Sequence, residues 1–380
     1  MDIIGAIKMN RPIDYAKAAC DTIMRQYSAA ELPTMDTFFY IGGVFLSGMQ
    51  RVYWETGEKK YFKYIKEWVD KYIFPDGSIL GYNHDYNVKE KTWFMKAVPK
   101  TFDHKQPGIL LFDLYKETKD ERYMKAIEYI YEQLAEWKKN SKGGFWHMSF
   151  TPNQMWLDSL YMIGPFLAMY SDLTKDKDAL EEAIKQCILM YENMRDKNGL
   201  LRHGWDESKK AVWARENGLS ETVWGRAVGW FTVAILDILD YVESTHPQYK
   251  KLCDIEEKVL KKVLEYRNDN GVWCQVLDRP QEPDNWYETS CSCLFVYSLF
   301  KAIRKKIISE NYIGDAKRAY SSIISKLKFD NGELLIDNIC AGTCIDEGDY
   351  KHYINRPKVT NDLHGTGAFV LMCTEAERMV

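Results

Sequence analysis

Two aspartates occur where a side-chain carboxyl group could do acid–base chemistry. Asp158 falls within the first turns of a predicted helix that is otherwise apolar. A charged group on a buried helix is costly unless it is paired or functional, and we favour a function. Asp103 stands shortly before Pro107, where an aspartate taken alone is better explained as a helix cap. Asp158 is therefore the first candidate for a catalytic acid.

A cluster of indole and guanidinium groups could recognise a sugar that carries a carboxylate. Trp224, Arg226 and Trp230 lie within two turns at the start of a predicted helix. Gly225 and Gly229 between them allow another chain segment to approach closely. Two indoles beside a guanidinium can form a sugar-stacking wall with a carboxylate clamp. Core packing with a cation–π contact explains the same residues equally well, so both interpretations stay open.

Two histidines lie in predicted loops. His147 follows Gly143-Gly-Phe-Trp146, and His203 lies within Leu201-Arg-His-Gly-Trp-Asp206. A lone loop histidine is more often a satisfied surface residue than a catalyst. Taken alone, these two positions therefore assign no role to either imidazole.

The composition excludes several functional classes. A net charge of −4 on 380 residues gives no electrostatic surface for nucleic acid or an anionic membrane. The sequence contains no phosphate-binding loop, H-E-x-x-H motif or nucleophile elbow, and its nine cysteines are irregularly spaced. We therefore expect no cofactor, no metal and reduced thiols. Because neither a signal peptide nor a membrane-length apolar run is evident, we expect a cytoplasmic protein without a membrane partner.

Recurring turns divide the chain into pairs of helices. Polar turns such as Thr118-Lys-Asp-Glu-Arg-Tyr123 alternate with glycine-containing turns such as Asp196-Lys-Asn-Gly199, each at intervals of roughly 55–70 residues. Between the turns, apolar residues recur at three and four positions. About twelve helices in six hairpins predict an all-α fold, a closed (α/α)6 barrel forming a single domain over residues 1–380. An open solenoid is the alternative, but irregular repeats without polar caps favour closure.

The lengths of the connections place the site on one rim of this barrel. Turns of the Thr-Lys-Asp type are short, whereas the connections at the other end of the hairpins are long. Long connections in a compact domain are usually functional, and the N-termini of the inner helices that follow them favour a carboxylate ligand. The long connections span residues 74–106, 140–155, 196–220, 268–288 and 328–362.

Six motifs occur in a characteristic order along the chain. They are Asp103 before Pro-Gly, Met155-Trp-Leu-Asp158-Ser-Leu-Tyr161, Arg202-His-Gly-Trp205, Trp224-Gly-Arg-x-x-Gly-Trp230, Tyr287-Glu-Thr-Ser290 and Asn361-Asp-Leu-His-Gly-Thr-Gly-Ala-Phe369. Over essentially the whole chain, this order resembles the unsaturated rhamnogalacturonyl hydrolases of glycoside hydrolase family 105. The resemblance implies an (α/α)6 barrel. It also implies removal of a Δ4,5-unsaturated galacturonyl residue from the non-reducing end of rhamnogalacturonan-type oligosaccharides made by lyases.

The resemblance also implies roles for the two aspartates. Asp158 corresponds to the general acid/base, and Asp103 to a second acid beside the sugar. Hydration of an enol ether needs one carboxyl group that works twice. Protonated Asp158 would give its proton to C4 and then accept one from the water that attacks C5. We expect apolar neighbours such as Trp156, with a second acid nearby, to raise the pKa of Asp158 so that it starts protonated.

Further positions correspond to the family's uronate pocket. These substrate-binding candidates are His147, His203, Trp156, Trp224, Arg226, Trp230, Phe38 and Tyr40. We expect Arg226 to hold the substrate carboxylate, Trp224 and Trp230 to stack on the sugar, and Asp103 and His203 to bind ring hydroxyls. The family often has Gly-Asn where this chain has Ala227-Val228, and often a tryptophan where it has Phe38, so the pocket wall is expected to differ.

Three other functions remain open from the sequence. The first is an unsaturated glucuronyl hydrolase acting on oligosaccharides from glycosaminoglycans, with the same fold and acid chemistry. The second is a sugar epimerase or isomerase, which would need paired histidines, and the third is a non-catalytic sugar-binding protein. The expected partner is an unsaturated oligosaccharide, with no nucleic acid or membrane partner, and the expected state is a monomer or weak homo-oligomer.

Overall fold

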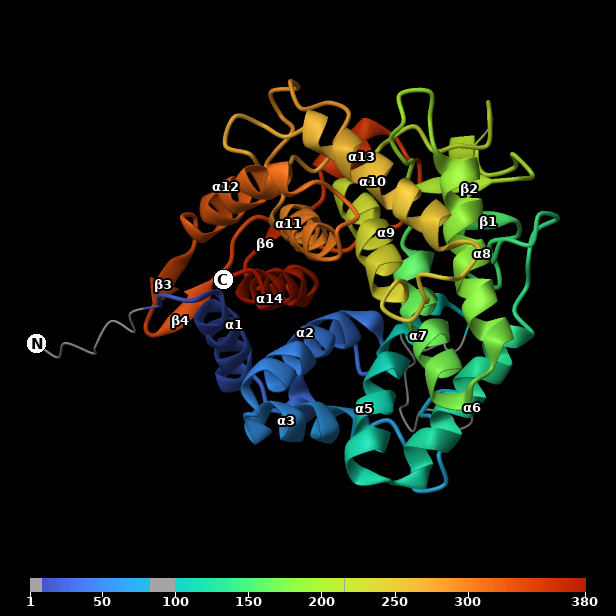
Figure 1. Cartoon of the computed structure of the whole chain (residues 1–380), viewed down its shortest axis with the longest axis vertical. Helices are drawn as coiled ribbons and strands as arrows, with labels where there is room; N and C mark the ends of the chain where they lie inside the picture. The colour runs from blue at the N-terminus through green and yellow to red at the C-terminus, as the bar shows by residue number, and fades with distance from the viewer. Residues whose placement is uncertain (1–8, 83–99, 215) are drawn as a thin grey trace, which may run out of the picture.

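The computed structural model describes residues 9–82, 100–214 and 216–380. Within them, twelve long helices alternate between an outer and an inner layer and close into a ring (Figure 1). The last inner helix, α14, packs on both α2 and α11, so the ring has no open end. The prediction of an (α/α)6 barrel is confirmed.

The two layers differ in which faces they bury. Every residue of inner helix α9 is buried, whereas outer helix α6 buries only one side, including Tyr123 and Ile130. The outer helices are α1 (Pro12–Gln26), α3 (Lys59–Asp70), α6 (Glu121–Ala135), α8 (Lys177–Met194), α10 (Tyr249–Glu265) and α12 (Ile313–Ile324). The inner helices are α2 (Tyr40–Thr56), α5 (Ile109–Thr118), α7 (Ser159–Thr174), α9 (Gly225–Ile238), α11 (Thr289–Arg304) and α14 (Leu363–Glu377).

The short turns follow a common design. Lys119 and Lys175 end the inner helices α5 and α7 in the left-handed backbone region, with φ of 57° and 65°. The next residue in each turn, Asp120 or Asp176, caps the following outer helix by accepting a backbone N–H. The repeated Thr-Lys-Asp sequence therefore reverses the chain in three residues.

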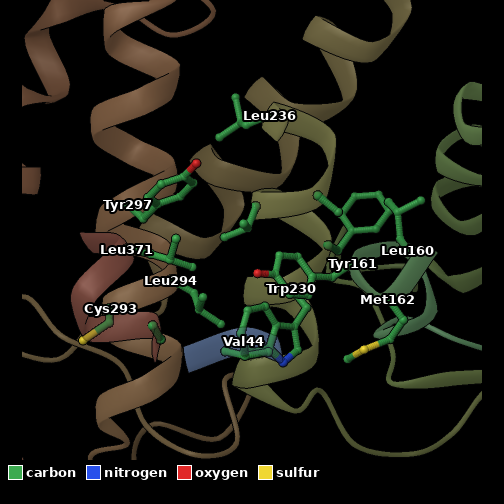
Figure 2. Close-up of a cluster of buried hydrophobic side chains, with 14 of the residues drawn as sticks. Val44, Leu160, Tyr161, Met162, Trp230, Leu236, Cys293, Leu294, Tyr297 and Leu371 are labelled. Carbon is green, nitrogen blue, oxygen red and sulfur yellow. The ribbon is translucent and has the colours of Figure 1, made fainter. Parts of the chain in front are cut away.

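Side chains from the inner helices fill the centre of the barrel (Figure 2). Val44 of α2, Tyr161 of α7, Trp230 of α9 and Leu294 of α11 converge there. Glycine permits a close helix approach here: a Cβ on Gly229 would lie 2.8 Å from the Leu294 side chain. The predicted role of this glycine in close packing is confirmed.

The long connections precede the inner helices, as predicted, and carry the short strands and one short helix. Residues 83–99 of the expected connection 74–106 lie outside the described residues. The connections contain α13 (Tyr350–Ile354) and antiparallel pairs β1 (Gln154–Trp156) with β2 (Gly204–Asp206), β3 (Lys328–Asp330) with β4 (Glu333–Leu335), and β5 (Ile339–Cys340) with β6 (Lys358–Val359). The 3-10 turns are η1 (Ala29–Glu31), η2 (Phe102–His104), η3 (Gln106–Gly108), η4 (Val212–Ala214) and η5 (Glu310–Tyr312). None of the helices in the described ranges is long and apolar enough to cross a membrane.

Candidate active site

The rim connections bring Asp103 and Asp158 close enough to interact electrostatically. Asp103 lies on η2, and an antiparallel bridge between Thr101 and Met148 ties this segment to the connection that leads to Asp158. Asp158 is the residue directly before α7. Burial, aided by the charge of Asp158, raises the pKa of Asp103 to about 7. In the described helical segments next to it, η2, η3 and α5, Asp103 makes no side-chain cap hydrogen bond, so its explanation as a cap is not supported.

The protonation of Asp158 differs from the sequence-based prediction. Burial acts to raise its pKa, but the imidazole of His203 counteracts this, with Nε2 2.9 Å from the Asp158 Oδ2. The net effect lowers the pKa of Asp158 below the ordinary value of an aspartate. The expectation that Asp158 starts protonated is therefore wrong, because the histidine that stabilises its charge lies 45 residues further along the chain. In the free site, the proton of the pair resides on Asp103.

His203 is a buried member of the site, not a surface histidine. The backbone N–H of Leu157 donates to the carbonyl of His203 at 2.8 Å, and β1 pairs with β2, so Asp158 and His203 are held side by side. On the other side of the ring, Nδ1 lies 2.6 Å from the hydroxyl of Tyr353. Since ionised Asp158 can only accept, the Nε2 that faces it carries a proton, and Nδ1 is paired with the Tyr353 hydroxyl.

His147 is connected to His203 through Trp156, whose ring contacts both imidazoles. Its ring stacks on Trp156 with centroids 4.3 Å apart, and its Nδ1 lies 2.7 Å from the hydroxyl of Ser159. Burial lowers the pKa of His147 to about 3, so the imidazole is neutral at physiological pH. His147 can therefore position Trp156 and donate or accept one hydrogen bond without contributing a charge.

Arg226 supplies two guanidinium donors to the site that are not used by other residues of the described structure. The side chain is 1% exposed, and Nη1 donates to the carbonyl oxygen of Cys340 at 2.6 Å. The guanidinium also lies 4.8 Å from the ring centroid of Trp224, which confirms the cation–π contact. Nε and Nη2 have no hydrogen-bond partner among the residues described. These two adjacent donors match the two oxygens of a carboxylate.

Comparison with known proteins identifies the family. The sequence profile of Glycosyl Hydrolase Family 88 matches residues 15–380. The structure also superposes with a TM-score of 0.87 on a family 105 glycoside hydrolase from C. acetobutylicum, at 32% identity over 96% of this chain and 99% of the other. The chain belongs to this group of glycoside hydrolases, families 88 and 105. The resemblance to family 105 is therefore confirmed.

More distant relatives of this glycoside hydrolase carry more specific names. The unsaturated rhamnogalacturonyl hydrolase YesR of Bacillus subtilis is 24% identical over 80% of this chain and 79% of its own length. The unsaturated glucuronyl hydrolase of Bacillus sp. GL1 shares the fold, with a TM-score of 0.68 at 16% identity over 96% of this chain and 97% of its own.

Two aromatic residues predicted to contact substrate lie elsewhere in the hydrolase. Phe38 is completely buried and stacks on Trp68 at a centroid distance of 5.6 Å, behind the first inner helix. Trp230 is 1% exposed and stacks on Tyr161 at 4.3 Å in the central core (Figure 2). Neither ring offers a face on which a sugar could stack. Trp224 lies at the site, but it is 2% exposed and its indole packs against Arg226 and His203.

The connection between β5 and α14 contributes site contacts that the sequence analysis missed. Besides the Cys340 carbonyl and the Tyr353 hydroxyl, Ile345 of this connection packs with Trp156 and Met148. The missed groups act through a backbone carbonyl, a single tyrosine hydroxyl and ordinary packing, none of which a motif signals. His364 and Asp362 were quoted as part of a motif but were given no role; the structure places His364 beside Tyr40.

Proposed function

We propose that this glycoside hydrolase removes a Δ4,5-unsaturated galacturonyl residue from the non-reducing end of rhamnogalacturonan-type oligosaccharides by adding water across C4=C5. The observation that carries the proposal is a carboxyl pair that holds one proton near neutral pH, on Asp103, beside ionised Asp158. Hydration of an enol ether needs one proton delivered to carbon and one taken from water. A pair that shares a single proton meets both needs.

Arg226 is proposed to hold the uronate carboxylate. Its open Nε and Nη2 donors are buried, so a charged ligand would gain a strong bidentate contact there. The beginning of α9 adds the partial positive charge of a helix N-terminus. A neutral sugar would leave these donors unsatisfied, which disfavours its binding.

The proton is proposed to move from Asp103 through Asp158 to the substrate. A bound uronate excludes water and adds a negative charge, both of which raise the pKa of Asp158 until it takes the proton of Asp103. Asp158 then protonates C4, and positive charge develops at C5 and the ring oxygen. Water attacks C5 while Asp158 accepts one of its protons, which restores the protonated carboxyl group. The hemiketal formed at C5 opens and releases the linked sugar.

The preferred substrate is supported by the name of YesR, a relative that matches four-fifths of the chain. The glucuronyl alternative is supported by the glucuronyl hydrolase from Bacillus sp. GL1, whose likeness is one of fold. Both substrates contain the same C4=C5 bond conjugated to a carboxylate, so the proposed chemistry applies to each.

The decisive experiment follows the near-UV absorbance of the C4=C5 bond after addition of the protein. Lyase-generated rhamnogalacturonan disaccharide and glycosaminoglycan disaccharide are tested in parallel, each with wild type and Asp158→Asn. Faster loss of absorbance on the rhamnogalacturonan disaccharide, absent with Asp158→Asn, is the expected result. Faster loss on the glycosaminoglycan substrate would select the alternative, and no loss on either would overturn the proposed reaction.

A further inference from the structure

Tyr40, His364 and Asp362 form a hydrogen-bonded chain at the edge of the site. The hydroxyl of Tyr40 lies 2.7 Å from Nε2 of His364, and Nδ1 of the same ring lies 2.5 Å from Oδ1 of Asp362. Tyr40 is the first residue of inner helix α2, and His364 lies in the first turn of inner helix α14. The chain therefore joins the first and last inner helices at the rim that carries the aspartates.

Close helix packing holds this chain in place. A Cβ on Gly367 would lie 2.7 Å from the Val44 side chain and 2.8 Å from its carbonyl oxygen, so only glycine allows α14 to approach α2 this closely. Asp362 also accepts the backbone N–H of His364 at 3.0 Å, which caps α14. The imidazole is 2% exposed and has little freedom to turn.

The proton positions in the chain follow from the charge of Asp362. Burial acts to raise the pKa of Asp362, but His364 and then Arg226 lower it to about 2, so this carboxyl group is ionised and can only accept. The proton on Nδ1 of His364 therefore points to Asp362. With the imidazole proton on Nδ1, Nε2 is an acceptor, and the Tyr40 hydroxyl donates a hydrogen bond to it. The Tyr40 oxygen is then left with lone pairs and no proton to offer a ligand.

Tyr40 lies within electrostatic range of the groups proposed to hold and protonate the substrate. Burial raises its pKa well above that of a free phenol, and the charges of Asp103, Arg226 and Asp158 all act on it. In the substrate, C5 carries the carboxylate and is also the carbon that water attacks. A group that interacts with both Arg226 and the aspartates is therefore a candidate for a role at C5.

We propose that Tyr40 holds the attacking water by accepting its second hydrogen, with His364 and Asp362 as positioning residues that keep the phenol oxygen an acceptor. The inference rests on the proposed function and adds a residue to its water step. One hydrogen of the water passes to Asp158, the other stays on oxygen and points to Tyr40, and an oxygen lone pair forms the bond to C5. No proton is transferred to Tyr40, so the balance of the reaction is unchanged.

The test compares Tyr40→Phe and His364→Gln with wild type on the unsaturated disaccharide. We expect kcat to fall by about 10- to 100-fold with KM within threefold, because the water loses its orientation while the sugar contacts remain. His246→Gln is the matched control: it removes another imidazole, paired with Glu181 at 2.8 Å, in the short connection before α10. The control should retain wild-type kcat.

A second measurement separates water positioning from a structural effect. Methanol has one hydroxyl hydrogen, so it can give that hydrogen to Asp158 but has none for Tyr40. Wild type should therefore favour water over methanol, and Tyr40→Phe and His364→Gln should form several-fold more methyl ketal, measured by mass spectrometry in methanol-containing buffer. A variant that is merely loosened would lose rate without changing this ratio.

The possible results separate failure of the water-positioning role of Tyr40 from failure of the proposed hydrolase function. If wild type does not consume the C4=C5 bond of either disaccharide, the proposed function fails. If wild type is active and both variants match it in kcat and in the ratio of methyl ketal to hydrated product, the function stands and the role of Tyr40 and His364 is wrong. An unchanged product ratio with reduced kcat also overturns the water-positioning role.

Discussion

The Tyr353 hydroxyl lies 2.6 Å from Nδ1 of His203, and this contact joins residues 150 positions apart. It fixes the ring whose other nitrogen faces Asp158 at 2.9 Å. A hydroxyl from the last connection of the barrel thus holds the histidine that lowers the pKa of the proposed catalytic group.

Removing the Tyr353 hydroxyl tests whether it holds His203 in place beside Asp158. In Tyr353→Phe, Nδ1 of His203 loses its hydrogen-bond partner, so the imidazole can turn and stabilise Asp158 less well. We expect kcat to fall about tenfold and the free energy of unfolding to fall by about 1 kcal/mol, the usual contribution of one hydrogen bond. Steady-state kinetics and urea unfolding measure both. Wild-type kcat with reduced stability would mean that the contact serves folding alone.

Asp158→Asn should abolish the reaction without unfolding the protein. The amide keeps the size of the side chain but can neither give a proton to C4 nor take one from water. We expect a loss of at least about a thousandfold in kcat, within the range of general acid–base catalysis. Thermal unfolding followed by circular dichroism is the control. A folded variant with activity near that of wild type would remove Asp158 from the mechanism.

Activity should decline as pH rises through about 7. The pair works when it holds one proton, and burial together with the charge of Asp158 places the pKa of Asp103 near that value. Above it the proton is lost, and no acid remains for C4. The pH profile of kcat/KM measures this alkaline limb. A profile that stays flat between pH 6 and 9 would contradict the assignment.

The same carboxyl group should make stability depend on pH. Between the ordinary pKa of an aspartate and about 7, folded Asp103 is protonated and the unfolded chain is not, so the folded state binds more protons and stability falls as pH rises. Asp103→Asn removes this dependence. We expect the variant to gain stability relative to wild type at pH 8 and little at pH 4, as measured by Tm at each pH. Equal differences at both pH values would show that Asp103 is not buried as a neutral acid.

Arg226→Lys should weaken substrate binding more than catalysis. Lysine keeps the charge but cannot offer the Nε and Nη2 pair, which is open in the described structure. We expect KM to rise about tenfold or more with a smaller change in kcat, measured on the unsaturated disaccharide. An unchanged KM would show that the carboxylate binds elsewhere.

The sequence predicted the barrel well because its signals are local. Helical periodicity and the Thr-Lys-Asp turns depend on neighbouring residues, and they located the six hairpins and the functional rim. The predictions that differ from the structure concern the direction in which a side chain points and contacts between residues far apart in the sequence. Phe38 and Phe39 are adjacent in the sequence but their rings face different surroundings: Phe38 packs against Trp68, whereas Phe39 contacts His104 and Tyr40 near the site.

Contacts between distant parts of the chain account for the remaining errors. Trp230 lies one helical turn after Arg226, and that turn carries its ring from the rim into the core. The pKa of Asp158 depends on His203, and Tyr40 meets His364 across 324 positions. Neither pairing leaves a local pattern in the sequence.

The packing of α14 against α2 has a consequence for how the protein matures. Tyr40 opens the first inner helix and His364 opens the last, so this part of the site exists only after the final helix has been synthesised and has docked. Until then, the apolar faces of α2 and α11 that α14 covers are exposed to solvent and to other nascent chains. Catalytic competence during synthesis should therefore arise in a single late step, which makes enzyme activity a direct reporter of ring closure during biogenesis.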